Sequence, residues 1–175
     1  MVSGGYGVPR VSVEFARKYF ILNSMLDICV AEVGVYKGDN AESMIKILEP
    51  QKIYLVDPYL DLIDDNGNPD EYEKFKQPCV DRLSVYKNIS WIFKKSNLAV
   101  EDVQEQLDFV YIDGDHHHWN VISDIALWYP KVKVGGILAG HDFGVDNVSK
   151  PVRMLLSEIQ NDEQDWWIIK KDDKI

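Results

Sequence analysis

A chain of 175 residues is long enough for one domain with its own hydrophobic core and too short for a second full domain. Its formal net charge of −10 would repel a phosphate backbone, so the composition argues against a nucleic-acid substrate. No apolar run approaches the roughly 18 residues of a membrane span, and the first residues, MVSGGYGVPR, lack a signal-peptide pattern. We therefore expect a cytoplasmic protein without a membrane partner.

Helical and strand patterns alternate along the chain. Helices are predicted over 12–23, 41–48, 71–86, 96–104, 122–129 and 149–159, and strands over 27–34, 53–56, 89–93, 107–112, 135–141 and 166–170. Short connections between them predict an α/β fold with a mostly parallel sheet and helices on both faces. The polar NDEQD before the last strand leaves little room for a further strand, so we expect six or seven.

Local signals refine these elements. Ser96 and Ser149 are predicted to cap the helices that they begin. The helix that ends at Pro130 is predicted to bury Ile122, Ile125, Ala126 and Tyr129. Segment 61–70 is rich in turn formers and acids, which predicts a surface loop, with a lid over a site as the alternative.

The two cysteines, Cys29 and Cys79, form no CxxC-type motif. We expect two reduced structural thiols, which a reducing compartment favours.

The stretch ICVAEVGVYKG, residues 28–38, reads as a buried strand, a glycine turn and the start of a helix. Its glycines allow a sharp turn and a close approach of backbone to a ligand, and the helix start offers unpaired N–H groups. A dinucleotide fingerprint would need GxGxxG, but Tyr36 stands where the middle glycine would be. A ligand without a pyrophosphate is therefore favoured, and Glu32 in the same stretch favours a cationic group.

Polar residues follow each predicted strand. In open sheets ligands bind beyond the carboxyl ends of the strands, so these residues should surround one crevice. Asp57 stands 23 residues after Gly34, close to the spacing at which an acidic residue binds ribose hydroxyls, which implies an adenosine-containing ligand. The other residues at strand ends are Glu32, Ser96, Asp113, Asp115, His116, His141 and Asp142.

Four segments in order, AEVGVYKG, IYLVDPY, LDFVYIDGDHHHW and VGGILAGHDF, resemble the motifs of class I S-adenosylmethionine-dependent methyltransferases. The paired IDGDH and GGxxxGHD segments are similar to a small methyltransferase domain family related to macrocin-type sugar O-methyltransferases. The resemblance implies a Rossmann-like, doubly wound fold. It also implies one domain over 1–175: an N-terminal helix segment over 1–26, a cofactor-binding core over 27–143, and a C-terminal helix and strand over 144–175.

The resemblance also implies roles for individual residues. Glu32, Gly34 and Gly38, with Tyr36 in the same turn, would shape the methionine end of the S-adenosylmethionine site. Asp57 would bind the ribose. Ser96 and its neighbours would approach the adenine, and Asp113 would lie near the sulfonium and the acceptor. The expected reaction is methylation of a small molecule, with an oxygen of a sugar-like or hydroxylated acceptor as the best guess.

A hydroxyl acceptor needs help in losing its proton. In one route His116 or His141 is the general base, since an imidazole titrates near neutral pH. In the other, Asp113 and Asp142 with His141 hold a divalent cation that lowers the pKa of the acceptor. An imidazole ligand would shift the preference of such a site away from Mg²⁺. His117 and His118 are interpreted as solvent-facing residues at the start of the next helix.

Two rival functions remain open. A metal-dependent hydrolase would use DGDHHH and HD, and would leave the spacing of Asp57 unexplained. A non-catalytic S-adenosylmethionine-binding module would bind the cofactor without turnover. Because little sequence remains for a cap over the acceptor, a second subunit in a homo-oligomer could supply that wall.

Overall fold

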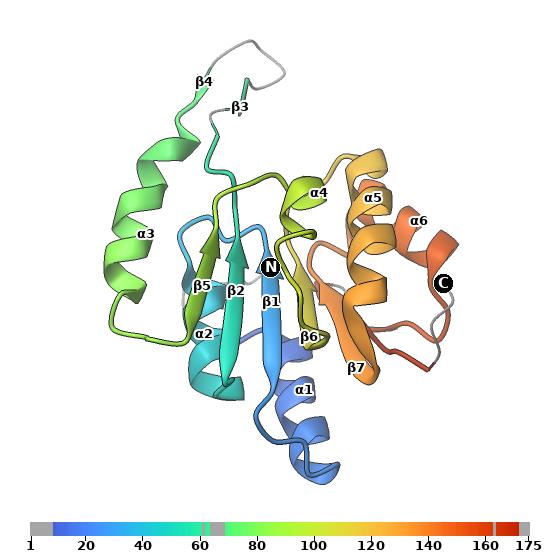
Figure 1. The fold of residues 1–175 in the computed structure, drawn as a ribbon. Helices are drawn as coiled ribbons and strands as arrows, with labels where there is room; N and C mark the ends of the chain where they lie inside the picture. The colour runs from blue at the N-terminus through green and yellow to red at the C-terminus, as the bar shows by residue number, and fades with distance from the viewer. Residues whose placement is uncertain (1–8, 61, 64–68, 163, 172–175) are drawn as a thin grey trace.

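The computed structural model describes residues 9–60, 62–63, 69–162 and 164–171 (Figure 1). The helices are α1 (Val11–Leu22), α2 (Asp39–Leu48), α3 (Lys76–Leu83), α4 (Ser96–Ala99), α5 (His118–Trp128) and α6 (Asp146–Leu155), with 3-10 turns η1 (Tyr72–Phe75) and η2 (Tyr129–Lys131). The strands are β1 (Cys29–Val33), β2 (Lys52–Val56), β3 (Leu62–Ile63), β4 (Pro69–Asp70), β5 (Ile89–Ile92), β6 (Leu107–Ile112), β7 (Val132–Gly140), β8 (Gln160–Asn161) and β9 (Trp166–Ile169).

The main sheet has seven strands in the order β5-β2-β1-β6-β7-β9-β8. The first five are parallel to one another, β9 is antiparallel to β7, and β8 is antiparallel to β9. The order reverses direction between β1 and β6, which is the switch point where ligands bind in doubly wound sheets. The predicted fold class is therefore confirmed, with seven strands.

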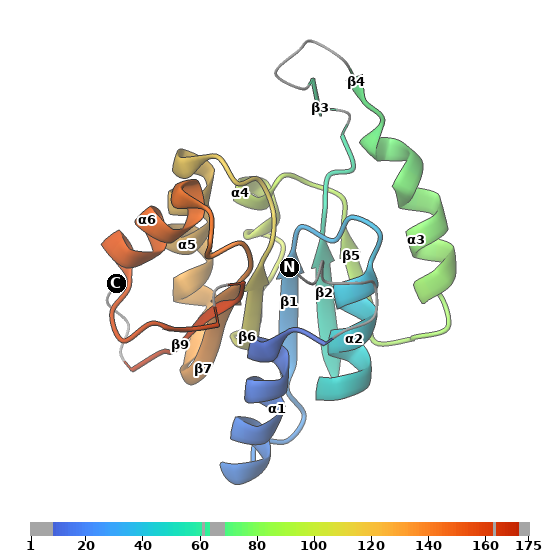
Figure 2. The ribbon, with the colours of Figure 1, turned by 180° about the vertical axis from the view of Figure 1, so that it is seen from behind.

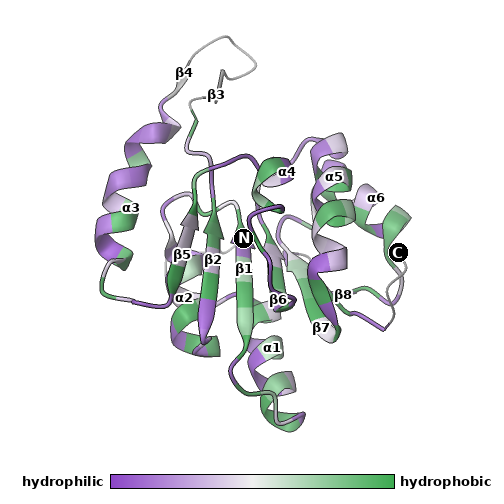
Figure 3. Cartoon of the chain, viewed as in Figure 1, coloured by the Kyte–Doolittle hydropathy of each residue, from purple (hydrophilic) through white to green (hydrophobic). Residues whose placement is uncertain are grey.

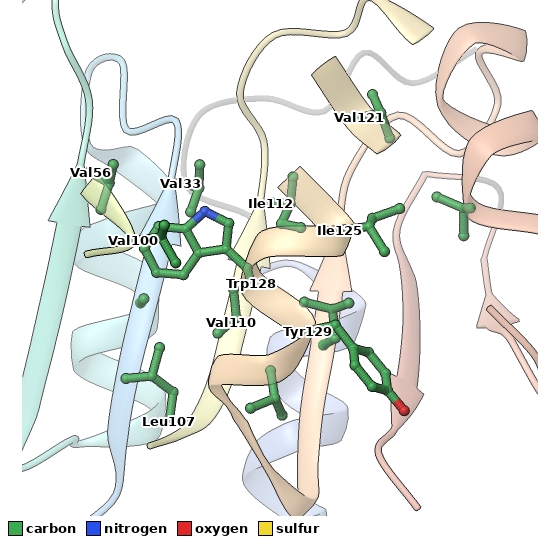
Figure 4. Close-up of a cluster of buried hydrophobic side chains, with 14 of the residues drawn as sticks. Val33, Val56, Val100, Leu107, Val110, Ile112, Val121, Ile125, Trp128 and Tyr129 are labelled. Carbon is green, nitrogen blue, oxygen red and sulfur yellow. The ribbon is translucent and has the colours of Figure 1, made fainter. Parts of the chain in front are cut away.

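Side chains of successive strand residues point to opposite faces of the sheet, and each face carries its own core. Val33, Val110 and Leu138 belong to the core on the side of α5 and α6. Figure 4 shows Val33 and Val110 with Trp128 of α5 in this cluster. Val30 and Phe109 pack on the opposite side, with α1 and α2 (Figure 2). Figure 3 shows hydrophobic central strands and a largely hydrophilic α3 at the margin of the molecule.

Several element boundaries differ from the prediction. The strand β8 overlaps the first residue of NDEQD, the segment expected to be a polar turn, and its residues Gln160 and Asn161 pair with β9. The two residues of β8 are enough to add a strand, because β8 lies at the edge of the sheet and pairs only with β9. The helix expected over 71–86 is shorter, with η1 leading into α3. Within the loop expected over 61–70, β3 and β4 form a short antiparallel pair, while residues 61 and 64–68 lie outside the described residues.

The predicted stripe on α5 is wrong in part. Ile125 and Tyr129 are buried as expected, but Ile122 is only partly buried and Ala126 is exposed. Val121, Asp124 and Trp128 are buried as well. Hydrogen bonds to Ser96 turn this face of α5 inward. The Trp128 indole N–H donates to Ser96 Oγ at 2.8 Å, and Ser96 also forms a hydrogen bond with the Asp124 carboxyl group. The spacing of apolar residues along a helix cannot predict such buried hydrogen bonds.

The two predicted caps are also wrong. Ser96 is the first residue of α4 and its side chain makes no cap, because its hydroxyl bonds α5. Ser149 lies inside α6, which begins earlier at Asp146. Both cysteines are free thiols as predicted, with Cys79 buried. Among the residues that the structure describes, no helix is both long and apolar enough to cross a membrane.

Candidate active site

A cavity of about 1270 Å³ opens at the carboxyl ends of the parallel strands. Its walls come from the turn after β1, the ends of β2 and β6, and the starts of α1, α4 and α5. The lining includes eight of the residues predicted from the sequence: Glu32, Gly34, Tyr36, Asp57, Ser96, Asp113, Asp115 and His116. The crevice inferred from the strand ends is therefore present in the structure.

The turn after β1 lies directly against the end of β6. Gly34 has φ +89°, and a Cβ placed there would lie 2.1 Å from the carbonyl oxygen of Asp113. The Asp113 backbone N–H donates to Val33 at 2.7 Å, which continues the pairing of the two strands. The absence of a side chain at Gly34 thus brings the glycine turn and Asp113 together.

Asp57 holds the glycine turn. Its carboxylate accepts N–H bonds from Val35 and Tyr36, both at 2.9 Å, and from Tyr59 at 2.8 Å. Tyr36 needs this support because its φ of +51° lies in the left-handed region, which is costly for a residue with a side chain. A carboxylate has about four acceptor positions, so one remains for a ligand.

The ring of Tyr36 stacks on Tyr72 with centroids 5.1 Å apart, and both rings lie at the edge of the cavity. Gly38 does not line it. Gly38 precedes α2 with φ +78°, and a Cβ there would lie 2.5 Å from Cys79 Sγ, so its role in the structure is close packing against α3.

Glu32 is a buried carboxyl group in the wall of the cavity. One oxygen accepts from the Asn40 amide at 2.8 Å, while Glu32 Oε2 and Asn40 Oδ1 are buried and have no hydrogen-bond partner among the residues that the structure describes. Burial raises the pKa of Glu32 well above its usual range. Unpaired buried polar atoms are costly, so this pair is equipped to bind a polar ligand.

The sequence analysis missed Asp124, which lines the same cavity from α5. Burial raises its pKa to about 6, against which the hydrogen bond from Ser96 acts. The sequence did hold a signal for Asp124, because it is an acidic residue in the middle of a largely apolar helix. Acidic residues are almost never buried without a partner, so a buried one indicates a polar contact.

Four predicted residues form one cluster at the ends of β6 and β7. His116 Nε2 lies 3.1 Å from Asp142 Oδ2 and 3.5 Å from Asp113 Oδ1. His141 Nδ1 lies 3.2 Å from Asp142 Oδ2 and 4.0 Å from Asp113 Oδ1. Asp142 has a left-handed φ of +57°, a strained conformation of the kind that clusters at functional sites. Asp113 and His116 line the cavity, whereas His141 and Asp142 do not.

The charges within the cluster are coupled. A hydrogen bond to Asp113 raises the pKa of His116 above its ordinary 6.5, against the effect of burial. A hydrogen bond from His141 lowers the pKa of Asp142. Asp113, His141 and Asp142 each offer a ligand atom, and these atoms lie within 4.8 Å of one another, so the predicted metal ligands are brought together.

Arg10 was not predicted, and it reaches this cluster from the start of α1. Its Nη1 contacts His141 Nε2, and its Nη2 lies 3.8 Å from Asp113 Oδ2. The sequence holds no local signal for this contact, because the two residues are 131 positions apart.

His117 and His118 lie at the start of α5, as interpreted from the sequence. His117 is exposed, and its ring forms a hydrogen bond with the Asp115 carboxylate. This carboxylate therefore stabilises the turn before α5.

Residues 31–143 match a family model described as a methyltransferase domain. This match spans more than half of the chain and all four motif segments. The chain belongs to this methyltransferase domain family. The recognition of the sequence as a class I methyltransferase is thereby confirmed.

The methyltransferase domain also resembles a curated relative, the uncharacterised protein R132 of Acanthamoeba polyphaga mimivirus, at 24% identity over 140 residues. The match covers 79% of this chain and 62% of the relative, so the chain spans less than two thirds of that protein's length.

Three solved structures share the fold. A Staphylococcus aureus protein with a provisional assignment as a caffeoyl-CoA O-methyltransferase has a TM-score of 0.67 at 14% identity, covering 93% of this chain and 84% of that one. An rRNA methylase from Streptococcus thermophilus has a TM-score of 0.66 at 16% identity, with 98% and 99% covered. The MycE methyltransferase of mycinamycin biosynthesis, in complex with Mg and SAH, has a TM-score of 0.61 at 15% identity, with 91% and 49% covered.

These likenesses confirm the methyltransferase fold of the domain, and the presence of SAH in the MycE structure agrees with the predicted cofactor. The acceptor, the individual site residues and the domain bounds stay predictions. The cytoplasmic location also stays a prediction.

Proposed function

We propose that this domain transfers a methyl group from S-adenosylmethionine to an oxygen of a small hydroxylated, sugar-like acceptor. One observation carries the proposal: the glycine turn of the donor site and the acid–base cluster meet at Asp113, whose backbone touches Gly34 and whose carboxyl lies 3.5 Å from His116. Transfer between two bound molecules requires this adjacency, because it depends mainly on alignment of the reacting atoms.

The donor half of the cavity suits S-adenosylmethionine, which supplies an electrophilic methyl group on a sulfonium. Asp57 has an acceptor position left for a ribose hydroxyl, and its other bonds hold the turn. The Asn40 oxygen is an acceptor for the cationic end of such a ligand, and a cation there would favour loss of the proton that burial keeps on Glu32. Ser96, the first residue of α4, and Asp124 of α5 line the cavity and would meet the adenine in this proposal.

His116 is the general base in this mechanism. Its Nε2 lies against the carboxylates of Asp113 and Asp142, so in the neutral ring that nitrogen donates and Nδ1 keeps a lone pair for the acceptor proton. The two carboxylates stabilise the imidazolium that results. The methyl group then forms a bond to the acceptor oxygen as its bond to sulfur breaks.

A divalent cation held by Asp113, His141 and Asp142 would instead lower the pKa of the acceptor hydroxyl. Arg10 already contacts two of these three residues, and no step of the mechanism above depends on a metal.

The size and charge of the site favour a small acceptor. A cavity of about 1270 Å³ exceeds the roughly 300–1,000 Å³ typical of one drug-sized ligand, so it has room for the cofactor and a compact second molecule. A nucleic-acid acceptor, as the rRNA methylase neighbour would suggest, is disfavoured by the net charge of −10. A homo-oligomer that completes the acceptor wall is part of the same proposal, and sedimentation in solution tests it.

Calorimetry with S-adenosylmethionine, S-adenosylhomocysteine, NAD and divalent metals in parallel tests the donor assignment. We expect both adenosyl ligands to bind and NAD not to bind. Binding of a metal without either adenosyl ligand would refute the proposal in favour of a hydrolase.

A screen of hydroxylated acceptors with radiolabelled donor then separates an enzyme from a binding module. We expect His116→Ala and Asp142→Ala to lower turnover while cofactor affinity stays nearly unchanged. Loss of cofactor binding in both variants would remove these residues from the catalytic role.

A further inference from the structure

Arg10 contacts two of the three residues of the candidate metal site, His141 and Asp113. Asp113, His141 and Asp142 present their ligand atoms to one another within 4.8 Å. The guanidinium contacts the ring of His141 and lies 3.8 Å from an oxygen of Asp113. A positive group of the chain itself therefore already offsets part of the negative charge of Asp113 and Asp142.

The contact with Arg10 determines the state of His141. A guanidinium has only donors and keeps its charge, so Nε2 of His141 must accept and the ring hydrogen must be on Nδ1. Nδ1 in turn lies 3.2 Å from Asp142, where it donates. With both nitrogens engaged, His141 is available neither as a base nor as a metal ligand, which leaves His116 as the imidazole that accepts a proton.

The structure fixes the position of Arg10. Arg10 is the N-cap residue of α1, and its carbonyl oxygen accepts a hydrogen bond from the Val13 N–H at 3.0 Å. Two residues later, Ser12 donates from its backbone N–H to the buried Asp165 at 3.0 Å, and Tyr111 on β6 donates to the other oxygen of Asp165 at 2.9 Å. This buried network ties α1 to β6, the strand that carries Asp113.

We propose that the guanidinium of Arg10 takes the place of a divalent cation at the acceptor end of this site. It offsets the charge of Asp113, keeps the Nδ1 proton on His141, and is the positive group available to the acceptor oxygen as its proton leaves. A metal ion can enter only by displacing it. This role of Arg10 toward the acceptor rests on the proposed function, whereas its competition with metal does not.

Binding of Mn²⁺, measured by electron paramagnetic resonance or calorimetry, tests the competition without acceptor or turnover. The unaltered protein should bind Mn²⁺ weakly, and Arg10→Met, which keeps the aliphatic stem, should bind it at least about tenfold more tightly because repulsion at contact distance is removed. Arg10→Lys keeps the charge and should behave as the unaltered protein does.

Arg17→Met is the matched control. Arg17 belongs to the same helix and makes an exposed ion pair with Glu49 at 3.5 Å, so its loss changes the net charge equally but far from the cluster. Its Mn²⁺ affinity should stay within about twofold of the unaltered protein, since exposed charges are screened by salt. In the double variant with Asp113→Asn, the affinity gained through Arg10→Met should be lost.

Three results would overturn the proposal: tight stoichiometric Mn²⁺ binding by the unaltered protein, equal affinities of Arg10→Met and Arg17→Met, or retention of the gained affinity without the Asp113 carboxylate. Mn²⁺ binding by the unaltered protein needs no variant, so the proposal can still be refuted if Arg10→Met does not fold. Affinity for S-adenosylhomocysteine is measured separately on the same samples, and its absence would count against the proposed function alone.

Discussion

Replacing Gly34 with alanine tests the contact that joins the donor turn to the acid–base cluster. The new Cβ would lie 2.1 Å from the carbonyl oxygen and 2.4 Å from the carbonyl carbon of Asp113. These are backbone atoms of a central strand end, which cannot rotate away as a side chain can. The turn and the end of β6 must therefore separate.

Gly135 is the natural control for this variant. It has a similar φ of +82°, against +89° at Gly34, but a Cβ at Gly135 would meet no atom within 4 Å. Gly135→Ala should cost about 1–2 kcal/mol for the left-handed backbone. Gly34→Ala should cost the same plus about 1–3 kcal/mol for the forced overlap.

Thermal unfolding followed by tryptophan fluorescence measures the difference. For a domain of this size each kcal/mol lowers Tm by about 2–4 °C, so Gly34→Ala should melt roughly 2–12 °C below Gly135→Ala. Calorimetry should show loss of S-adenosylhomocysteine binding in Gly34→Ala only. Equal melting temperatures, or unchanged binding by Gly34→Ala, would refute the close approach as the reason for the glycine.

Three further predictions concern single carboxyl and imidazole groups. Asp57→Asn should weaken cofactor binding by about ten- to a hundredfold, as expected for a lost charged hydrogen bond, while Asp102→Asn in a surface ion pair should not; calorimetry decides. The pKa of Asp124 is raised from 3.8 to about 6, so the folded state holds this proton more tightly and stability is lost as pH rises between those values. Asp124→Asn should therefore stabilise the ligand-free domain at pH 8, by up to about 3 kcal/mol, and hardly at pH 4; an equal effect in urea unfolding at both values would contradict this. Because the pKa of His116 is raised above 6.5, turnover should increase with pH through a limb above that value, and His116→Gln should abolish the limb; a limb that persists would assign the base elsewhere.

Sequence patterns located the site because its residues follow strands. Glu32, Asp57, Asp113 and His141 each stand in or just after an apolar run, and parallel strands carry their carboxyl ends to one edge. Local order in the chain therefore translated directly into proximity in space. The same logic predicted the order of elements and the two-faced sheet.

The errors of prediction have one common cause. Ser96 was expected to cap its own helix, but it bonds Trp128 across the cavity wall, and the inward face of α5 follows from that bond. β8 exists because β9 offers it a free edge. In each case a contact between distant segments outweighed the local propensity.

Arg10 shows most clearly the difference between what local sequence predicts and what contacts between distant segments decide. Composition, motifs and strand ends were sufficient for the methyltransferase fold, the donor turn and the cluster of acids and imidazoles, since all of these are encoded in short apolar runs and the residues next to them. The cation that meets this cluster comes from the other end of the chain, placed by the bond between Ser12 and Asp165. Only the packing of α1 against the sheet decides which charge faces Asp113, because that charge depends on a contact that no local pattern encodes.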